Sequence, residues 1–310
     1  MSDVRKRDLP VTDDVNAGSA SGSDDRPARA DAAATNAGAG VQVNPTGTLA
    51  VVALDAALLA ATARIGALAL LLGIAVTQAV LAVSWVFGTT LPGRRGALLL
   101  AALAAAGADV AVSVRPHAGL GALLALVGLA VPAMFVHQLV RGAARVRLLE
   151  SVGLIGVLLV AMIAVSALQQ LWHEFGDPTT SGRVVSAVVL AIGAGLVGDL
   201  FIDMVAPVPH FDAKVQRGLL GVLGAAVFGA AVGYLTLRPV TQFAGGRSLF
   251  AGAALGALAA LLAVAASFVE HSTPVPSLGF ARRVRPVLGA LVPLALASPV
   301  ALVICLAIRM

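Results

Sequence analysis

Two aspartates about one helical turn apart are the residues of this sequence best placed to do chemistry. Asp199 and Asp203 belong to the run Gly-Asp-Leu-Phe-Ile-Asp at 198–203. Side chains four residues apart share one face of a helix, so both carboxylates point the same way. Such a pair can bind a divalent metal ion or hold one proton between its members. The alternative is a hydrated pair at a membrane interface, neutralised by Lys214 or Arg217.

Two more acids, Asp55 and Asp109, stand alone inside apolar runs. An ionisable side chain at the centre of a bilayer costs at least about 2.5–3.5 kcal/mol, so each is a candidate for proton or ion handling. Pairing with an arginine near another helix end is the structural alternative. The sequence leaves both interpretations open.

Basic residues gather in two segments, the loop from Pro207 to Arg217 and the stretch 282–285. They could contact an anionic headgroup or a nucleotide phosphate. The positive-inside rule would place the same charges there without any ligand. The candidate contacts are Lys214, Arg217, Arg282, Arg283 and Arg285.

The surroundings of these residues are those of a chain that lies mostly in lipid. Apolar residues make up 59% of it and charged residues 12%, whereas about 25% is usual for soluble domains. The net charge of +5 forms no continuous basic stripe, which argues against a nucleic-acid partner. Cys305 is the only cysteine, so an intrachain disulfide and a multi-cysteine metal site are excluded.

Apolar runs long enough to cross a bilayer as helices repeat along the chain, since about 20 residues span its roughly 30 Å core. The run 48–88 is too long for one span and divides at Arg64 and Gly66. Its first part, 48–63, is short and contains Asp55. The other runs are 96–114, 118–140, 151–172, 184–206, 218–237, 248–269 and 287–308.

These runs predict an all-α fold, a polytopic transmembrane helical bundle over 48–310. It has nine spans, or eight if 48–63 lies in the interface. Residues 1–47 are polar, with no apolar period that could bury a core, and we predict a disordered tail.

Lysines and arginines of the loops predict the orientation, because their excess marks the cytoplasmic side. One set of alternate loops carries ten of them, and the other set together with the C-terminus carries six. With nine spans the tail also lies inside. We therefore expect a multi-pass protein of the cytoplasmic membrane.

Two further features predict how the spans are held. Gly229 with Gly233, and Gly252 with Gly256, place glycines about one turn apart on single faces, which lets helices approach closely. Trp85 falls near a span end, where an indole ring favours the headgroup layer.

The run Gly198-Asp199-Leu200 resembles the opening of the Gly-Asp-Leu-x-Glu-Ser element of phosphatidate cytidylyltransferases, membrane enzymes that make CDP-diacylglycerol from CTP and phosphatidic acid. Ile202 stands where that element has its glutamate, and the family's other motifs have no counterpart here. The resemblance therefore implies a divergent relative with lost or altered catalysis. Mg²⁺ is the cofactor that it implies if the enzyme is active.

Three functions stay open from the sequence. The first is a lipid-binding relative of that family in envelope or phospholipid metabolism. The second is a small secondary transporter that uses its buried aspartates for coupling. The third is a structural partner in a homo-oligomer or a larger membrane complex.

Overall fold

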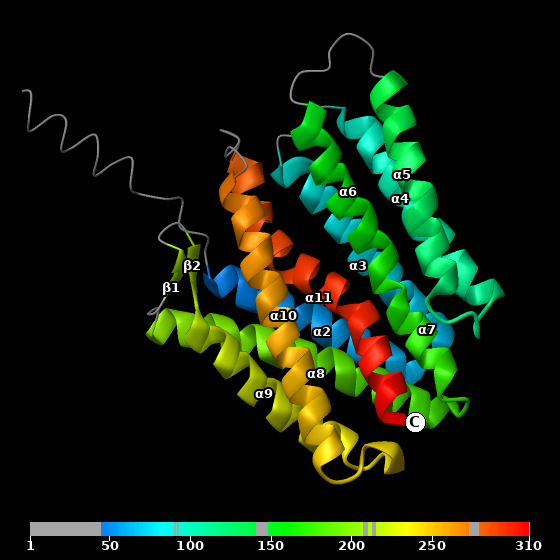
Figure 1. Ribbon diagram of the computed structural model, residues 1–310, viewed down its shortest axis with the longest axis vertical. Helices are drawn as coiled ribbons and strands as arrows, with labels where there is room; N and C mark the ends of the chain where they lie inside the picture. Colours follow the sequence, from blue (N-terminus) through cyan, green and yellow to red (C-terminus); the bar gives the residue numbers. More distant parts are fainter. Residues whose placement is uncertain are drawn as a thin grey trace, which may run out of the picture. The chain divides into compact units, whose positions relative to one another are not determined.

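Helices form almost all of the described part of the chain, which comprises residues 45–89, 91, 93–140, 148–206, 210–212, 215–272 and 279–309 of a computed structural model (Figure 1). The helices are α2 (Pro45–Ile65), α3 (Ala67–Gly88), α4 (Arg94–Val114), α5 (Gly121–Val140), α6 (Leu148–Val165), α7 (Ala167–Glu174), α8 (Pro178–Val205), α9 (Leu219–Leu237), α10 (Gly246–Ser272) and α11 (Gly279–Arg309). A short 3₁₀ helix, η1 (Thr241–Phe243), precedes α10, and two strands, β1 (His210–Asp212) and β2 (Val215–Gly218), form an antiparallel hairpin before α9.

Nine helical segments of the described residues are long and apolar enough to cross a membrane, with α6 and α7 together forming one of them. The predicted all-α polytopic bundle is thus confirmed, including its short first span. That span begins at Pro45, and most of the predicted tail, residues 1–44, lies outside the described residues. This is the architecture of a polytopic membrane protein.

A single glycine joins the first two spans, as the sequence predicted. Gly66 lies between α2 and α3 with φ 149°, a backbone conformation that side chains with a Cβ rarely adopt. The chain therefore reverses direction within one residue. Positions on α2 and α3 that are equally far from Gly66 lie at similar depth.

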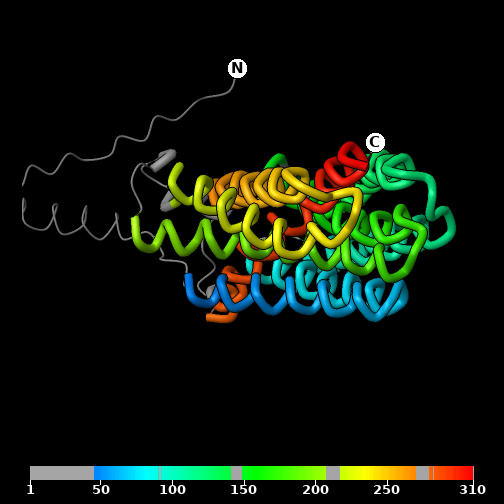
Figure 2. The backbone as a smooth tube through the Cα atoms, turned by 90° about the horizontal axis from the view of Figure 1, so that it is seen from below, coloured from blue at the N-terminus to red at the C-terminus, as the bar shows by residue number. Residues whose placement is uncertain are grey.

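The spans pack as two groups of helices with α2 and α11 between them. Helices α8, α9 and α10 lie against one another on one side of the bundle, and α3 to α6 lie on the other (Figure 1). Helix α11 contacts members of both groups, and α2 lies along α8 (Figure 2). The buried faces of α2, α3 and α11 thus lie in the interior of the bundle.

Glycines set the distances within the α8–α9–α10 group. A Cβ on Gly229 would overlap the carbonyl oxygen of Gly252, and one on Gly256 would overlap that of Ala225. A Cβ on Gly233 would lie 2.6 Å from the Cα of Gly252. The predicted glycine faces therefore do bring helix backbones together.

Large apolar side chains cover the outside of the bundle. Leu54 and Leu68 are each 71% exposed, and Val140 is 81% exposed. Exposed apolar side chains at this density require a hydrocarbon environment rather than water. The outward faces of the spans are therefore lipid-facing.

Helix α8 begins at a cap that we did not predict. The side chain of Asp177 accepts a hydrogen bond from the Thr180 backbone N–H at 2.7 Å, and Pro178 occupies the first turn. This hydrogen bond to the ionised carboxylate lowers the pKa of Asp177. The helix starts six residues before the predicted limit of the span at 184.

Candidate functional site

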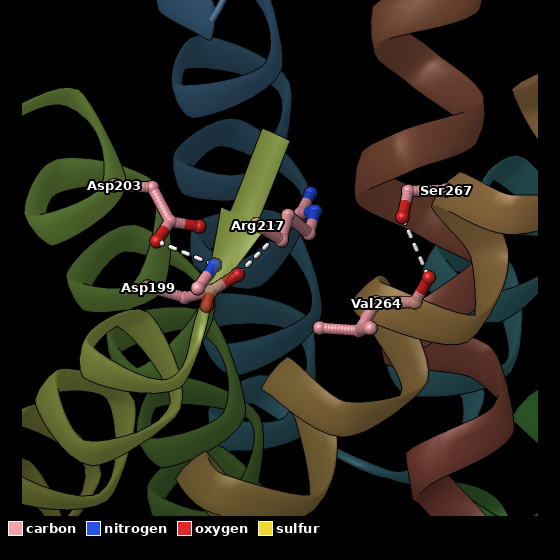
Figure 3. Close-up of polar contacts among 6 residues, drawn as sticks. Asp199, Asp203, Arg217, Val264 and Ser267 are labelled. Atoms are coloured by element: carbon pink, nitrogen blue, oxygen red, sulfur yellow. Dashed lines mark hydrogen bonds and ion pairs between the residues drawn. The ribbon is translucent and has the colours of Figure 1, made fainter. Parts of the chain in front are cut away.

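The two aspartates singled out from the sequence lie together at the end of α8 and hold the segment that enters α9 (Figure 3). Asp199 is fully buried, and its Oδ2 forms an ion pair with Nη1 of Arg217. Oδ1 of Asp203 accepts a hydrogen bond from the backbone N–H of Gly218 at 3.1 Å. Of the two cationic partners considered, Arg217 is thus the one seen, and Lys214 lies outside the described residues.

Helix α9 brings its positive end to these carboxylates. Gly218 is the residue that caps α9, and the free N–H groups of a helix N-terminus favour nearby negative charge. A Cβ on Gly221 would lie 2.6 Å from Oδ1 of Asp199 and 2.6 Å from Oδ1 of Asp203. Glycine at 221 therefore leaves room for both carboxylates against the first turn of α9.

This arrangement stabilises negative charge more readily than it offers a metal site. No group of three or more His, Cys, Asp or Glu side chains that could hold a metal ion occurs among the described residues. A Mg²⁺ ion at Asp199 and Asp203 would have two carboxylate ligands and would have to compete with Arg217. The arrangement as it stands is a charge-neutralised joint between α8 and α9.

The other basic residues predicted to contact an anion differ in exposure. They lie in the first turns of α11, which begins at Gly279 rather than at the predicted 287. Arg283 is exposed, whereas Arg285 is only 6% exposed. The side chain of Arg282 lies outside the described part of the structure.

Arg285 borders an apolar cavity of about 150 Å³ between α3, α6, α10 and α11. Trp85 of α3 lines the same cavity and is 4% exposed, so its ring lies inside the bundle. Trp85 thus lies near a span end, as predicted, but inside the bundle rather than on the lipid-facing surface that the predicted anchor would occupy. Its Nε1 is buried without a hydrogen-bond acceptor in the described structure.

Asp55 lies in the middle of the hairpin formed by α2 and α3. Its Oδ1 accepts a hydrogen bond from the Thr77 hydroxyl at 2.7 Å, and its side chain is 8% exposed. Both residues lie ten positions from the ends that meet at Gly66, about 15 Å at 1.5 Å per residue. That distance is half of the roughly 30 Å hydrocarbon core, so this carboxyl lies at mid-membrane depth.

Asp109 belongs to a second polar cluster, which includes Gln78 of α3. Its Oδ1 accepts hydrogen bonds from the Ser166 hydroxyl at 2.7 Å and from Nε2 of Gln78 at 3.4 Å. Gln78 also donates to the Ser166 hydroxyl at 3.2 Å and to the Met162 carbonyl at 3.0 Å. Since Thr77 and Gln78 are neighbours on α3, this helix connects the surroundings of both carboxyls.

The junction between α6 and α7 positions this cluster. The backbone N–H of Ser166 donates to the carbonyl of Ile163, three residues earlier, which is a 3₁₀-type turn inside the span. Tight turns of this kind inside helices often mark functional hinges. Ser166, fully buried, is thereby turned toward α3 and α4.

Polar side chains continue from Asp109 toward the end of α7. The Ser113 hydroxyl donates to the Asp109 carbonyl at 2.7 Å and accepts from Nε2 of Gln169 at 3.1 Å. Nε2 of Gln170 donates to the Pro116 carbonyl and to Oε1 of Glu174, the latter at 3.2 Å. A row of hydrogen-bonding groups thus leads from Asp109 to the membrane boundary at Glu174.

Comparison with protein-family models, with curated proteins and with solved structures finds no match. The chemistry of the chain's own residues must therefore carry the functional argument.

Proposed function

We propose that this protein is a proton-coupled secondary transporter of the bacterial cytoplasmic membrane, and that Asp55 and Asp109 take up and release the coupling proton. The supporting observation is the difference between the acids inside the spans. Asp199 has a cationic partner, whereas the hydrogen bonds of Asp55 and Asp109 within the described residues come only from neutral hydroxyl and amide groups. Acids in this situation in membrane proteins commonly form proton relays.

A proton suits these two carboxyls better than a metal ion does. Each stands apart from other acids, and a lone carboxylate with one or two neutral donors offers a multivalent cation too few ligands. An ionised carboxylate without a counter-charge is costly in hydrocarbon, whereas the protonated form is neutral. A cycle between the two forms therefore ties a change of charge to a change of conformation.

Asp55 and Asp109 also lie at depths that suit a relay. Asp55 is at mid-membrane depth, and Asp109 lies five residues, about 8 Å, from the end of α4. The row that begins at Ser113 and Gln169 leads from there to the boundary. The 3₁₀-type turn at Ser166 supplies a place where the span can change conformation without breaking.

Infrared spectroscopy tests proton binding without knowledge of the substrate. Reconstituted protein is titrated across neutral pH, and the carbonyl band of protonated carboxylic acids is followed in difference spectra. We expect Asp55→Asn and Asp109→Asn each to remove part of this band. Both variants keep an oxygen that accepts the Thr77 or Ser166 hydroxyl, so they should fold. Asp177→Asn, at an exposed carboxyl, is the matched control; spectra identical to wild type in both buried variants contradict the proposal.

Transport is tested in everted membrane vesicles that respiration has acidified inside. Solutes from several chemical classes are added. Recovery of the quenched acridine-dye fluorescence reports protons that leave the vesicle interior in symport or antiport with a solute. We expect at least one class to release protons in wild-type vesicles and not in Asp109→Asn vesicles. Release that depends on Na⁺ rather than on the pH gradient would instead assign the carboxyls to sodium.

One observation favours a second function at the end of α8. Oδ1 of Asp199 is buried without a hydrogen bond from the described residues, and it lies against Gly221 together with Oδ1 of Asp203. A Mg²⁺ ion bound by these two oxygens would suit the resemblance to phosphatidate cytidylyltransferases. The test is turnover of CTP and phosphatidic acid with Mg²⁺ by purified protein, which Asp199→Asn should abolish.

A further inference from the structure

The cavity beside Arg285 has room for part of one lipid chain. Its apolar lining includes Leu288, Val292 and Leu296, which follow Arg285 along α11. The axial distance from Arg285 to Leu296 is about 16 Å at 1.5 Å per residue. This length matches one leaflet, half of the roughly 30 Å hydrocarbon core. A dry apolar cavity of about 150 Å³ takes in groups of the size of benzene, so it has room for a segment of a single chain.

Among the described lining residues, polar groups occur only at the Arg285 end. Arg285 is buried, and its guanidinium is a cation with several N–H donors. The indole of Trp85 adds an N–H donor that has no acceptor in the described structure. A carboxylate or phosphate placed here would accept hydrogen bonds from both, and hydrogen bonds between charged groups are the strong ones.

The cavity can be reached from the bilayer. Ala265 of α10 lines it and is itself exposed on the lipid-facing surface. Trp85 lies three residues from the end of α3, so the polar end is near the depth of the headgroups. An amphiphile can thus enter sideways with its head at the interface and its chain along α11.

We propose that this cavity binds an acyl chain that carries an anionic head, with the head at Arg285 and Trp85. The proposal uses none of the carboxyls of the proposed transport function and stands independently of it. The head belongs to a free fatty acid or to an anionic phospholipid, which share the negative charge and the chain.

Quenching of Trp85 fluorescence by brominated chains tests the proposal directly. The chain has two tryptophans, so Trp172→Phe leaves Trp85 as the sole reporter. This variant, in phosphatidylcholine nanodiscs, is titrated with brominated stearic acid, brominated phosphatidylglycerol and brominated phosphatidylcholine. We expect at least one anionic probe to quench at a mole fraction about tenfold lower than the zwitterionic probe. A hydrogen bond to a charged group strengthens binding by about this factor. The anionic probe that quenches identifies the source of the head.

Two variants and a matched control separate the contribution of the charge from that of the cavity. Arg285→Gln should remove the preference for anionic probes, whereas Arg283→Gln, at an exposed position in the same part of α11, should keep it. Ala265→Phe fills the entrance without altering a charge and should weaken quenching by every probe. Equal quenching by all three probes in the Trp172→Phe protein overturns the proposal, as does quenching by the anionic probe that Ala265→Phe leaves as strong as before.

Discussion

The four aspartates inside the spans carry the same carboxyl group, and their neighbours give them different chemistry. Asp199 and Asp203 lie against Arg217 and the N-terminus of α9, where negative charge is stabilised. Asp55 and Asp109 meet only neutral donors in the described structure. The first pair therefore fastens two helices, and the second pair is suited to a change of protonation.

Removal of Arg217 tests the fastening role. Arg217→Gln leaves the carboxylate of Asp199, fully buried, without its counter-charge, and breaking a buried pair in this way costs roughly 3–5 kcal/mol. The double variant Asp199→Asn with Arg217→Gln should recover much of that loss. Unfolding by a graded series of SDS mole fractions measures both.

Arg183→Gln is the control for this comparison, because Arg183 is exposed and its loss should change stability by less than about 0.5 kcal/mol. A double variant no more stable than Arg217→Gln would show that the ion pair is not the source of the effect.

At the residue scale the sequence could identify the acids but not their partners. A charged residue in an apolar run is conspicuous, so Asp55, Asp109, Asp199 and Asp203 were found directly. Their neutral partners Thr77, Gln78 and Ser166 resemble ordinary polar residues in spans, and the hydrogen bonds join positions 22 to 57 residues apart. No local spacing encodes such pairings.

Helices α8, α9 and α10 depend on glycine contacts that local sequence does predict. Gly252→Ala places a methyl group on the carbonyl of Gly229, and a clash with backbone cannot be relieved by a rotamer change. We expect loss of stability of at least about 1–3 kcal/mol. Gly128→Ala in α5 is the matched control, because a Cβ there meets nothing within 4 Å.

The control variant should be neutral or more stable by up to about 1 kcal/mol, since alanine favours a helix over glycine. The same SDS unfolding series measures both variants. Equal stability of the two would mean that α9 and α10 can separate at no cost.

The cap of α8 makes a pH-dependent contribution to stability. The pKa of Asp177 is lower in the folded protein because its carboxylate accepts the Thr180 N–H, so its contribution is present above the ordinary pKa of an aspartate. It is lost as the pH falls through the lowered value. Asp177→Ala should therefore melt earlier than wild type at pH 7, and the difference should shrink under strong acid.

Asp177→Asn caps the helix without ionising, so its melting temperature should lack the acid-dependent part. Thermal melts of the three proteins at neutral and acidic pH make the comparison. A difference between Asp177→Ala and wild type that is independent of pH would assign the effect to packing.

At the element scale the apolar runs located every span, and deviations arose where polar residues extend a helix. Helix α11 includes its arginines, because a basic first turn can lie in the interface, and α8 extends back to its Asp-Pro cap. The turn at Ser166 was not predicted, since nothing in an apolar run of helix-forming residues marks one hydrogen bond of 3₁₀ type.

At the scale of the whole molecule, the nine spans of the described residues place Pro45 and Arg309 on opposite sides of the membrane. The loops then alternate, and the count of basic residues predicts which side each one faces. The segments around Ala118 and Thr179 are separated by two spans and must share a side, which the sequence predicts to be the outer one. Leu149 and Phe280, at the starts of α6 and α11, should face the cytoplasm.

Cysteine labelling in intact cells tests this orientation, and the native Cys305 does not interfere because it is fully buried. Cysteines introduced at 118 and 179 should react with an impermeant thiol reagent from outside. Those at 149 and 280 should react only after the cells are opened. The reverse pattern would place the tail outside, and labelling of 118 without 179 would show that the segment between them does not cross twice. With the reverse pattern, the row of polar groups that leads from Asp109 toward Glu174 would open to the cytoplasmic side, and a proton relay would have to run in the opposite sense.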